Sequence, residues 1–410
     1  MRILLVHNFY GSSAPSGENA VVLEEAQVLR KAGHEVIEHF VYSDSVRDRG
    51  LLRLLGAAAV VPWNQAALVR LRRVVRERTP DVMHVHNVFP LLSPAIFRAA
   101  AGTRTAVVNT LHNYRIACAN AAFLRNRQVC TLCSDRRSVL PALRYGCYRN
   151  SRVATFPLAA CIALHRGARA YARHVDAFVA LTDFQRNILI RAGLPPERTY
   201  TKPNCMPAPV RCLPWDQRES KAAFIGRVSQ EKGLDVLLKA WALWGPAAPR
   251  LEIIGGGPEL DCLRNSIPNE IKDRVDFLGP KPLAETYTRL ASARLLIIPS
   301  IWFEAFPLVL REALAFAVPV VASRLGAFLE LVEPRDVGRL FTAGDPQSLF
   351  QTVVACWNDD PALQLMSVAA RAEFEARYSP AANVTALASI YRRAMHHKQS
   401  ESASCVTIPC

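Results

Sequence analysis

Two acidic side chains lie eight residues apart in a stretch that can bind an anion flanked by hydroxyl groups. Glu304 follows the apolar run 295–298, and Glu312 falls where the apolar spacing becomes helical. This order predicts a buried strand, a loop and a helix. The first turn of a helix has unpaired N–H groups that bind anions, and the two carboxylates can accept hydrogen bonds from hydroxyls around that anion site. The alternative is that Glu304 only caps the helix and that Glu312 is solvated.

Two cations, Arg227 and Lys232, form a second candidate group. They lie between a predicted strand that ends near residue 225 and a helix that begins near Leu234, and Gly226 allows the backbone to turn. Two cations at the N-terminus of a helix fit a diphosphate. We favour this interpretation over ordinary surface charges, because both cations belong to one strand-to-helix turn.

A histidine, His112, directly follows a third predicted strand, over residues 105–111. In an α/β sheet, ligands bind at the carboxyl ends of the strands. A histidine there can hydrogen-bond a sugar hydroxyl or polarise a reacting group. The alternative is that His112 is purely structural. Only the other candidate residues support a functional role for it.

Four cysteines lie in a polar, arginine-rich insert at residues 115–152. They are Cys118, Cys130, Cys133 and Cys147. Four thiolates around a central C-x2-C predict a tetrahedral zinc site that ties a long loop together. Such a site has no open position, so its role would be structural. The alternative is that reduced thiols pack beneath the loop.

Strands and helices alternate through both halves of the chain, which predicts an α/β protein with two doubly wound, Rossmann-like domains. The predicted N-terminal domain covers residues 1–205, a proline-rich linker 206–218 and the C-terminal domain 219–376. One helix is expected over 156–173, and another, over 377–397, is expected to pack back toward the N-terminal domain. Residues 398–410 are expected to be a disordered tail.

A loop of small residues, 8–19, follows the first predicted strand and opens a helix, and it contains Gly17. Strand, loop and helix in this order outline a cradle for a phosphate or a sugar. The loop has neither the dinucleotide fingerprint nor the Walker spacing, and Gly-Gly-Gly-Pro at 255–258 does not continue as that fingerprint. A nicotinamide cofactor is therefore disfavoured.

The positive charge is confined to the first half of the chain. The net charge is +15, and residues 1–205 hold 28 Lys/Arg against 13 Asp/Glu, whereas 206–410 hold 22 of each. Such asymmetry predicts an anionic partner for the N-terminal half: phospholipid, nucleic acid or a phosphorylated acceptor. The apolar runs are too short for a membrane span or a signal peptide, and scattered cysteines suit a reducing compartment. We therefore predict a cytoplasmic protein.

Residues 47–78 alternate basic and aliphatic side chains and include Trp63. A basic amphipathic helix with a tryptophan is typical of segments that lie on anionic lipid, where each Lys/Arg adds about 1 kcal/mol. The alternative is an ordinary solvated helix. The segment predicts reversible, peripheral binding to the inner face of the cell membrane.

Two motifs in the second half resemble those of glycosyltransferase family 4, the retaining enzymes of the GT-B fold. They are G-R-x4-K-G at 226–233 and E-x7-E at 304–312, supported by the G-G-G-P turn and by Gly326-Ala327 with Glu330. The resemblance extends over nearly the whole chain. The cysteine insert, which ends Cys147-Tyr148-Arg149, resembles that of one subgroup, many of whose members are linked to bacterial surface polysaccharide.

The resemblance implies a role for each matching residue. Arg227 and Lys232 would hold the donor diphosphate, and Glu312 would bind the ribose hydroxyls. Glu304, with the backbone from Ala305 through Phe306 to Leu308, would meet the transferred sugar and its phosphate. His112 would touch the sugar from the first domain. Three positions depart from the family pattern: Ser16 precedes Gly17 in place of a glycine, Ala305 replaces a frequent glycine, and Pro307 removes an N–H donor.

These expectations describe an enzyme without a catalytic cofactor. It would move a sugar from a nucleoside-diphosphate sugar to a glycan or lipid-linked acceptor, with the departing charge met by cations and helix N-termini. One alternative is a sugar-nucleotide epimerase of the same fold. Another is a nucleic-acid-binding protein, which is disfavoured because the basic half has no aromatic stacking array and no known module.

Overall fold

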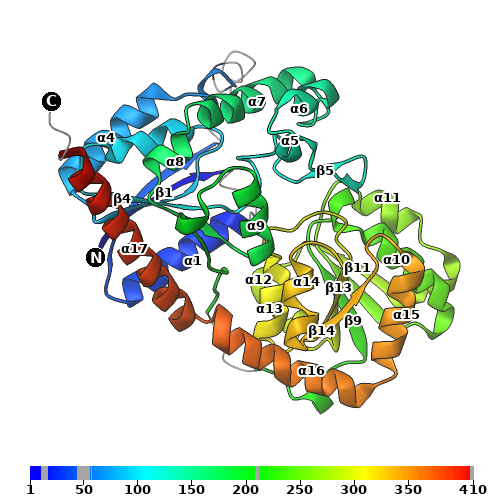
Figure 1. Cartoon of the computed structure of the whole chain (residues 1–410). Helices are drawn as coiled ribbons and strands as arrows, with labels where there is room; N and C mark the ends of the chain where they lie inside the picture. The colour runs from blue at the N-terminus through cyan, green and yellow to red at the C-terminus, as the bar shows by residue number, and fades with distance from the viewer. Residues whose placement is uncertain (11–16, 44–55, 57, 208–211, 407–410) are drawn as a thin grey trace. The chain divides into compact units, whose positions relative to one another are not determined.

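The computed structural model describes residues 1–10, 17–43, 56, 58–207 and 212–406, with side chains up to residue 401 (Figure 1). The chain divides into two compact units. Unit 1 comprises Met1–Phe123, Thr131–Cys205 and Asn383–Cys410, and unit 2 comprises Leu124–Cys130 and Met206–Ala382. Each unit is built on its own six-stranded parallel sheet. The predicted pair of doubly wound α/β domains is therefore confirmed.

The sheet of unit 1 has the strand order β2-β1-β3-β4-β7-β8. Its strands are β1 (Arg2–Phe9), β2 (Glu35–Tyr42), β3 (Val82–Asn87), β4 (Ala106–Thr110), β7 (Ala177–Ala180) and β8 (Thr199–Thr201). Apart from Arg2, every residue of β1, β3, β4 and β7 is buried, as expected of strands covered on both faces. β2 and β3 lie on opposite sides of β1, so the strand order reverses between β1 and β3. A doubly wound sheet binds its ligand at the carboxyl ends of the two strands that flank this reversal.

Helices cover both faces of this sheet. α1 (Gly17–Lys31) and α17 (Pro380–Val406) share one core cluster with the strands, through Ala26, Leu29, Leu387 and Tyr391. The other helices of unit 1 are α4 (Gln65–Arg78), a 3-10 helix (Pro94–Ala100), α5 (Leu132–Asp135), α6 (Leu140–Tyr145), α7 (Arg152–Gly167), α8 (Ala170–His174) and α9 (Asp183–Arg191). The described helices include none that is long and apolar enough to cross a membrane.

Two predicted helix boundaries are wrong. The helix expected over 156–173 begins earlier, at Arg152, where Ser151 caps it, and is broken into α7 and α8 at Arg169, whose φ is +48°. The last helix does not end at 397 but continues to Val406. No glycine or proline interrupts the chain between Pro380 and Pro409, so nothing local stops the helix after His397. Only residues 407–410 of the predicted tail lie outside the described residues.

The sheet of unit 2 has the strand order β11-β10-β9-β12-β13-β14. Its strands are β9 (Lys221–Ile225), β10 (Arg250–Ile254), β11 (Val275–Gly279), β12 (Leu295–Ile298), β13 (Val320–Ser323) and β14 (Gly338–Phe341). Its helices are α10 (Leu234–Trp244), α11 (Leu260–Asn265), α12 (Leu283–Ala291), α13 (Leu308–Ala315), α14 (Phe328–Leu331), α15 (Pro346–Trp357) and α16 (Asp360–Glu373). α10 and α15 pack on one face, through a core centred on Trp241.

In unit 2 the strand order reverses between β9 and β12. The carboxyl end of β9 leads into the Arg227–Lys232 turn, and that of β12 leads into the Glu304 loop. Both candidate groups therefore lie at the topological switch point of their sheet, where ligands of doubly wound folds bind.

Candidate functional site

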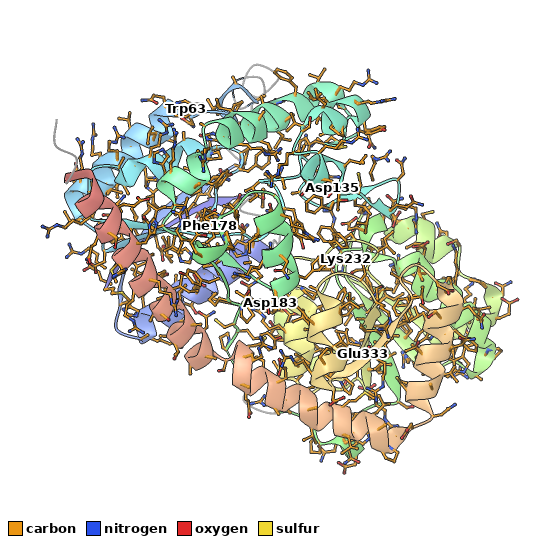
Figure 2. The ribbon with its side chains drawn as sticks, in the orientation of Figure 1. Trp63, Asp135, Phe178, Asp183, Lys232 and Glu333 are labelled. Carbon is orange, nitrogen blue, oxygen red and sulfur yellow. The ribbon has the colours of Figure 1, made fainter. Side chains whose placement is uncertain are left out.

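Lys232 and Glu304 meet at the switch point of unit 2. Nζ of Lys232 donates a hydrogen bond to Oε1 of Glu304 at 2.6 Å, and the hydroxyl of Ser300 donates to the same oxygen at 2.9 Å. Glu304 is 5% exposed, whereas the Lys232 side chain, labelled in Figure 2, is 26% exposed. The lysine thus retains an open side that can face a ligand, while the carboxylate is held firmly behind it.

Gly233 allows the two loops to come this close. Its φ is +67°, and a Cβ built on it would lie 2.0 Å from the carbonyl oxygen of Pro299. Only glycine fits a left-handed conformation packed against another backbone in this way. Ile301 N–H also donates to the carbonyl of Glu231 at 3.0 Å, so the β9 and β12 loops are joined on both sides of Lys232.

The Gly-Gly-Gly-Pro turn supports the same loop from the other side. Gly226 N–H donates to Ile254 and Val228 N–H to Gly256, at 3.0 and 2.9 Å. A Cβ on Gly257 would lie 2.1 Å from the carbonyl oxygen of Val228. The glycines therefore let β10 and β9 continue side by side beyond the sheet, which fixes the backbone that carries Arg227.

The remaining predicted donor-site residues of unit 2 lie on the same two strand-to-helix connections, β9 to α10 and β12 to α13, or in α13 itself. Arg227 is exposed and forms no ion pair with the described residues. Glu312 is partly exposed on α13, with Oε1 3.8 Å from Nη2 of the buried Arg311. Phe306 is buried against Tyr378, at 5.7 Å between ring centroids, and Leu308 is the first residue of α13. The backbone between them forms the N-terminal end of that helix.

Sequence reasoning missed two residues at this site. Ser300 is fully buried and orients Glu304, and the ring of Trp302 lies 5.5 Å from Nζ of Lys232. A cation above an aromatic face is stabilised by the ring quadrupole. The sequence feature that could have identified them is their position directly after the predicted strand, in the run Ser300-Ile301-Trp302. Loops at strand ends often carry functional side chains.

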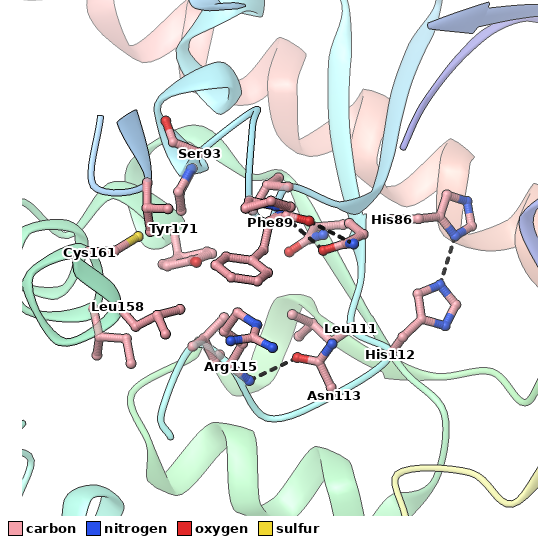
Figure 3. Close-up of a pocket in the computed structure, with 18 of the residues that line it drawn as sticks. His86, Phe89, Ser93, Leu111, His112, Asn113, Arg115, Leu158, Cys161 and Tyr171 are labelled. Atoms are coloured by element: carbon pink, nitrogen blue, oxygen red, sulfur yellow. Dashed lines mark hydrogen bonds between the residues drawn. The ribbon is translucent and has the colours of Figure 1, made fainter. Parts of the chain in front are cut away.

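In unit 1, His112 lies one residue beyond Leu111, at the end of β4, and its Nε2 is 2.9 Å from Nδ1 of His86 (Figure 3). Burial, followed by the neighbouring His86, holds the pKa of His112 well below its usual range, so the ring is neutral at pH 7. Both histidines line a pocket with an empty volume of about 660 Å³. Its other walls are largely apolar, including Phe89, Leu158 and Tyr171.

Gly17 is the first residue of α1 and is exposed. The preceding loop residues, 11–16, including Ser16, lie outside the described part of the chain. The next residue, Glu18, accepts a hydrogen bond from Asn113 Nδ2 at 2.8 Å, and burial raises the pKa of its carboxyl. The start of α1 is thereby tied to the residue after His112.

The four cysteines of the insert are not among the close groups of possible metal ligands in the described part of the chain. All four are described, yet among the described residues only Glu25, His84 and His86, and Asp176, His397 and Glu401, form groups of three with ligand atoms within 4.8 Å of one another. The Cys118 thiol instead donates to Oδ1 of Asn120 at 2.9 Å. The arrangement gives no support to a preformed Cys118/Cys130/Cys133/Cys147 zinc site, and zinc stays a prediction that metal analysis of the purified protein would test.

Two family models match consecutive parts of the chain. The glycosyl transferase 4-like domain matches residues 16–205, and glycosyl transferases group 1 matches residues 211–373. The chain belongs to glycosyltransferase family 4. It is therefore a transferase, as the sequence motifs predicted.

Relatives of known activity agree with this membership. The phosphatidyl-myo-inositol mannosyltransferase of Mycolicibacterium smegmatis is 26% identical over 370 residues, which cover 86% of this chain and 83% of the relative. The D-inositol 3-phosphate glycosyltransferase of Corynebacterium diphtheriae is 34% identical, over 44% of each chain. The second match therefore spans less than half of that relative.

Solved structures share the GT-B fold. Anabaena Alr3699/HepE in complex with UDP-glucose aligns with a TM-score of 0.62 and 18% identity over 98% of this chain and 100% of that chain. Sucrose-phosphate synthase from Thermosynechococcus elongatus aligns with a TM-score of 0.67 and 16% identity over 96% and 99%. At these identities the likeness establishes the fold alone.

Proposed function

We propose that this enzyme transfers a sugar, with retention of the anomeric configuration, from a nucleoside-diphosphate sugar to a glycan or lipid-linked acceptor in surface polysaccharide synthesis. The observation that carries the proposal is the Lys232–Glu304 pair at the switch point of unit 2, 2.6 Å apart. An open ammonium beside a fixed carboxylate suits a ligand that has phosphate oxygens next to sugar hydroxyls.

The proposed reaction breaks the bond between the anomeric carbon and the diphosphate oxygen. Arg227 and Lys232 stabilise the negative charge that develops on the leaving phosphate, and the N-terminal end of α13 adds its backbone dipoles. Glu304 accepts a hydrogen bond from the sugar, and Glu312 from the ribose. The acceptor hydroxyl attacks from the face that the diphosphate leaves, and its proton passes to the departing phosphate oxygen. No metal or redox cofactor takes part in these steps.

The alternatives are less well supported. An epimerase would need no acceptor, and both family models describe transferases. The basic half would suit nucleic acid in charge, but the family model that matches residues 16–205 describes a glycosyl transferase domain. Incubation of the protein with labelled sugar nucleotide and no acceptor distinguishes a transferase from an epimerase. Only an epimerase would convert the label to a new sugar nucleotide.

UDP is expected to raise the melting temperature of the protein more than GDP or ADP, by about 5 °C at saturation. A ligand that binds only the native state stabilises it by mass action. UDP is chosen because the Anabaena structures contain UDP and UDP-glucose. A thermal-shift panel measures it. Lys232→Ala should abolish the shift, whereas Lys239→Ala, an exposed lysine on α10, should keep it. A shift for none of the three nucleotides would contradict the proposed donor.

We further propose that the enzyme binds anionic lipid through α6 and α7. The described part of the 47–78 segment is less suited to this, because the apolar side of α4, including Leu68, Leu71 and Val75, is buried in the core. Trp63 stacks on His165 instead, at 5.8 Å. Residues 47–55 lie outside the described part of the chain.

The α6–α7 face combines exposed apolar side chains with unopposed positive charge. Its apolar members are Leu140, Tyr145, Val153, Phe156 and Leu164. Residues 136–175 contain eight arginines and no acidic residue. Side chains three residues apart on a helix share one side, so Val153 and Phe156, 82% and 62% exposed, can enter a bilayer together. The arginines would then meet phosphate head groups.

Val153→Glu/Phe156→Glu is expected to weaken binding to phosphatidylglycerol-containing vesicles at least about tenfold, because the apolar insertion is lost and two negative charges are added. Co-sedimentation at low and high salt measures this. The matched control is Leu365→Glu/Val368→Glu on α16, a pair with the same spacing, 72% and 67% exposed. Equal loss in both double variants would contradict the assignment of the face.

A further inference from the structure

A cluster of charged and titratable side chains lies inside unit 1, in the core beneath His112. Glu25 comes from α1, His84 and His86 from β3, and Lys202 follows β8. None of the four is more than 4% exposed. Buried charges are tolerated only where they are paired and hydrogen-bonded, so the pairing in this cluster is informative.

The carboxylate of Glu25 is the centre of the cluster. Oε2 accepts a hydrogen bond from Nζ of Lys202 at 2.6 Å, and Oε1 lies 3.2 Å from Nε2 of His86. Burial alone would raise the pKa of Glu25, but Lys202 and His86 hold it well below its usual range. The carboxylate is thus ionised; it accepts a hydrogen bond from Lys202 and lies at ion-pair distance from His86.

The ionised carboxylate determines which nitrogens carry protons. Because Nε2 of His86 faces a carboxylate oxygen, it carries the hydrogen, and Nδ1 of the same ring is then an acceptor. That Nδ1 lies 2.9 Å from Nε2 of His112, as the dashed line in Figure 3 marks, so His112 must donate from Nε2. The remaining nitrogen of His112, Nδ1, then carries a lone pair and can only accept.

His84 also approaches the carboxylate, with Nδ1 3.4 Å from Oε1 of Glu25, but its hydrogen bonds go to other partners. Its Nε2 lies 2.7 Å from the hydroxyl of Thr110, and its Nδ1 lies 2.8 Å from the hydroxyl of Tyr391 on α17. His86 therefore forms the link between Glu25 and His112. The H-x-H spacing follows from the strand, because alternate residues point to the same face of a sheet.

Glu25, His84 and His86 also bring three possible metal ligands within 4.8 Å of one another. A divalent cation bound to them would lie close to the ammonium of Lys202, which already bonds the same carboxylate at 2.6 Å. Lys202 is 1% exposed, so no solvent screens that repulsion. The cluster is thus better suited to hydrogen bonding than to metal binding.

We propose that Glu25 and His86 are positioning residues that hold His112 in one orientation and one tautomer, with Nδ1 ready to accept a hydrogen bond from a substrate hydroxyl. This rests on the proposed function and on the sugar contact that the family resemblance implies for His112. A histidine fixed by a buried partner loses no free energy to reorientation when the sugar binds.

The tautomer can be observed without any substrate, in protein with 15N-labelled histidine. We expect the His112 proton on Nε2, with a through-hydrogen-bond coupling to Nδ1 of His86. His86→Phe, which keeps the ring volume, should remove the coupling. Glu25→Gln/Lys202→Met, which removes both buried charges together, should add a second His112 tautomer, whereas the control Glu24→Gln on the same helix should not. A wild-type proton on Nδ1, or spectra unchanged in both test variants, would overturn the proposal.

Kinetics then separate positioning from a structural role. With the sugar nucleotide that the thermal-shift panel selects, His86→Phe should lower kcat about tenfold in the wild-type background and not at all in a His112→Ala background, because the two residues act as one unit. Equal losses in both backgrounds would mean a structural role and overturn positioning. Normal kcat in His112→Ala would overturn His112 as a sugar contact, even where the tautomer is the expected one.

Discussion

Lys232→Ala is expected to lower kcat at least about a hundredfold, the effect of losing one preorganised donor to a developing negative charge. Lys232 is the cation that the structure fixes, by its 2.6 Å bond to Glu304 and by the ring of Trp302. Because the leaving diphosphate gains charge as the bond breaks, the loss should appear in kcat as well as in kcat/KM. Release of nucleoside diphosphate from the selected donor measures it.

Two companion variants and one control sharpen this result. Arg227→Ala and Glu304→Ala should each lower kcat about as much. Arg227 stabilises the departing charge, and Glu304 contacts the sugar. The control is Lys239→Ala, which should retain the wild-type rate. The Lys239 side chain is 68% exposed on α10, one turn after Asp235. Near-normal rates in all three site variants would refute the assignment of the donor site, whatever the fold.

The loops that carry the candidate donor-site residues could be located from the sequence, because each of them follows a buried strand. Four apolar residues at 295–298 and the strand ending at 225 are short, uniform and bounded by glycine or proline, so their ends could be located. The topological switch point then brings the two strand ends together. The 2.6 Å contact between Lys232 and Glu304 depends on β9 and β12 being neighbours, and the structure gives that strand order.

The insert and the buried cluster were harder to predict, for a different reason. The central C-x2-C predicts zinc, which stays a prediction, but thiol spacing does not encode where the loop packs. Cys133 and Cys147 pack at the edge of an apolar cluster with Leu158. Glu25 and Lys202 are 177 residues apart. Nothing local in either one predicts a pair, because a charged residue on an amphipathic helix is solvated far more often than it is buried.

Lys202→Met is expected to destabilise the protein by about 3–5 kcal/mol, the cost of leaving one buried charge without its partner. Glu25 and Lys202 are 2% and 1% exposed, so water cannot replace the lost ammonium. Glu25→Gln/Lys202→Met should recover much of that loss, because the uncompensated charge is gone. Urea unfolding measures both, and Arg30→Met, which removes an exposed partner of Glu38, is the control, with an expected cost of about 0–1 kcal/mol.

The pH dependence should reverse between wild type and Lys202→Met. In the wild type, the pKa of Glu25 lies well below the 4.5 of the unfolded chain, so its stabilisation is present above that pH and is lost as pH falls toward the lower value. Without Lys202, burial is the largest remaining influence and raises the pKa, so protonation relieves the buried charge. Lys202→Met should therefore be less destabilising at about pH 5 than at about pH 8. A penalty that grows as pH falls would contradict an ionised Glu25 and, with it, the donor direction through His86 to His112.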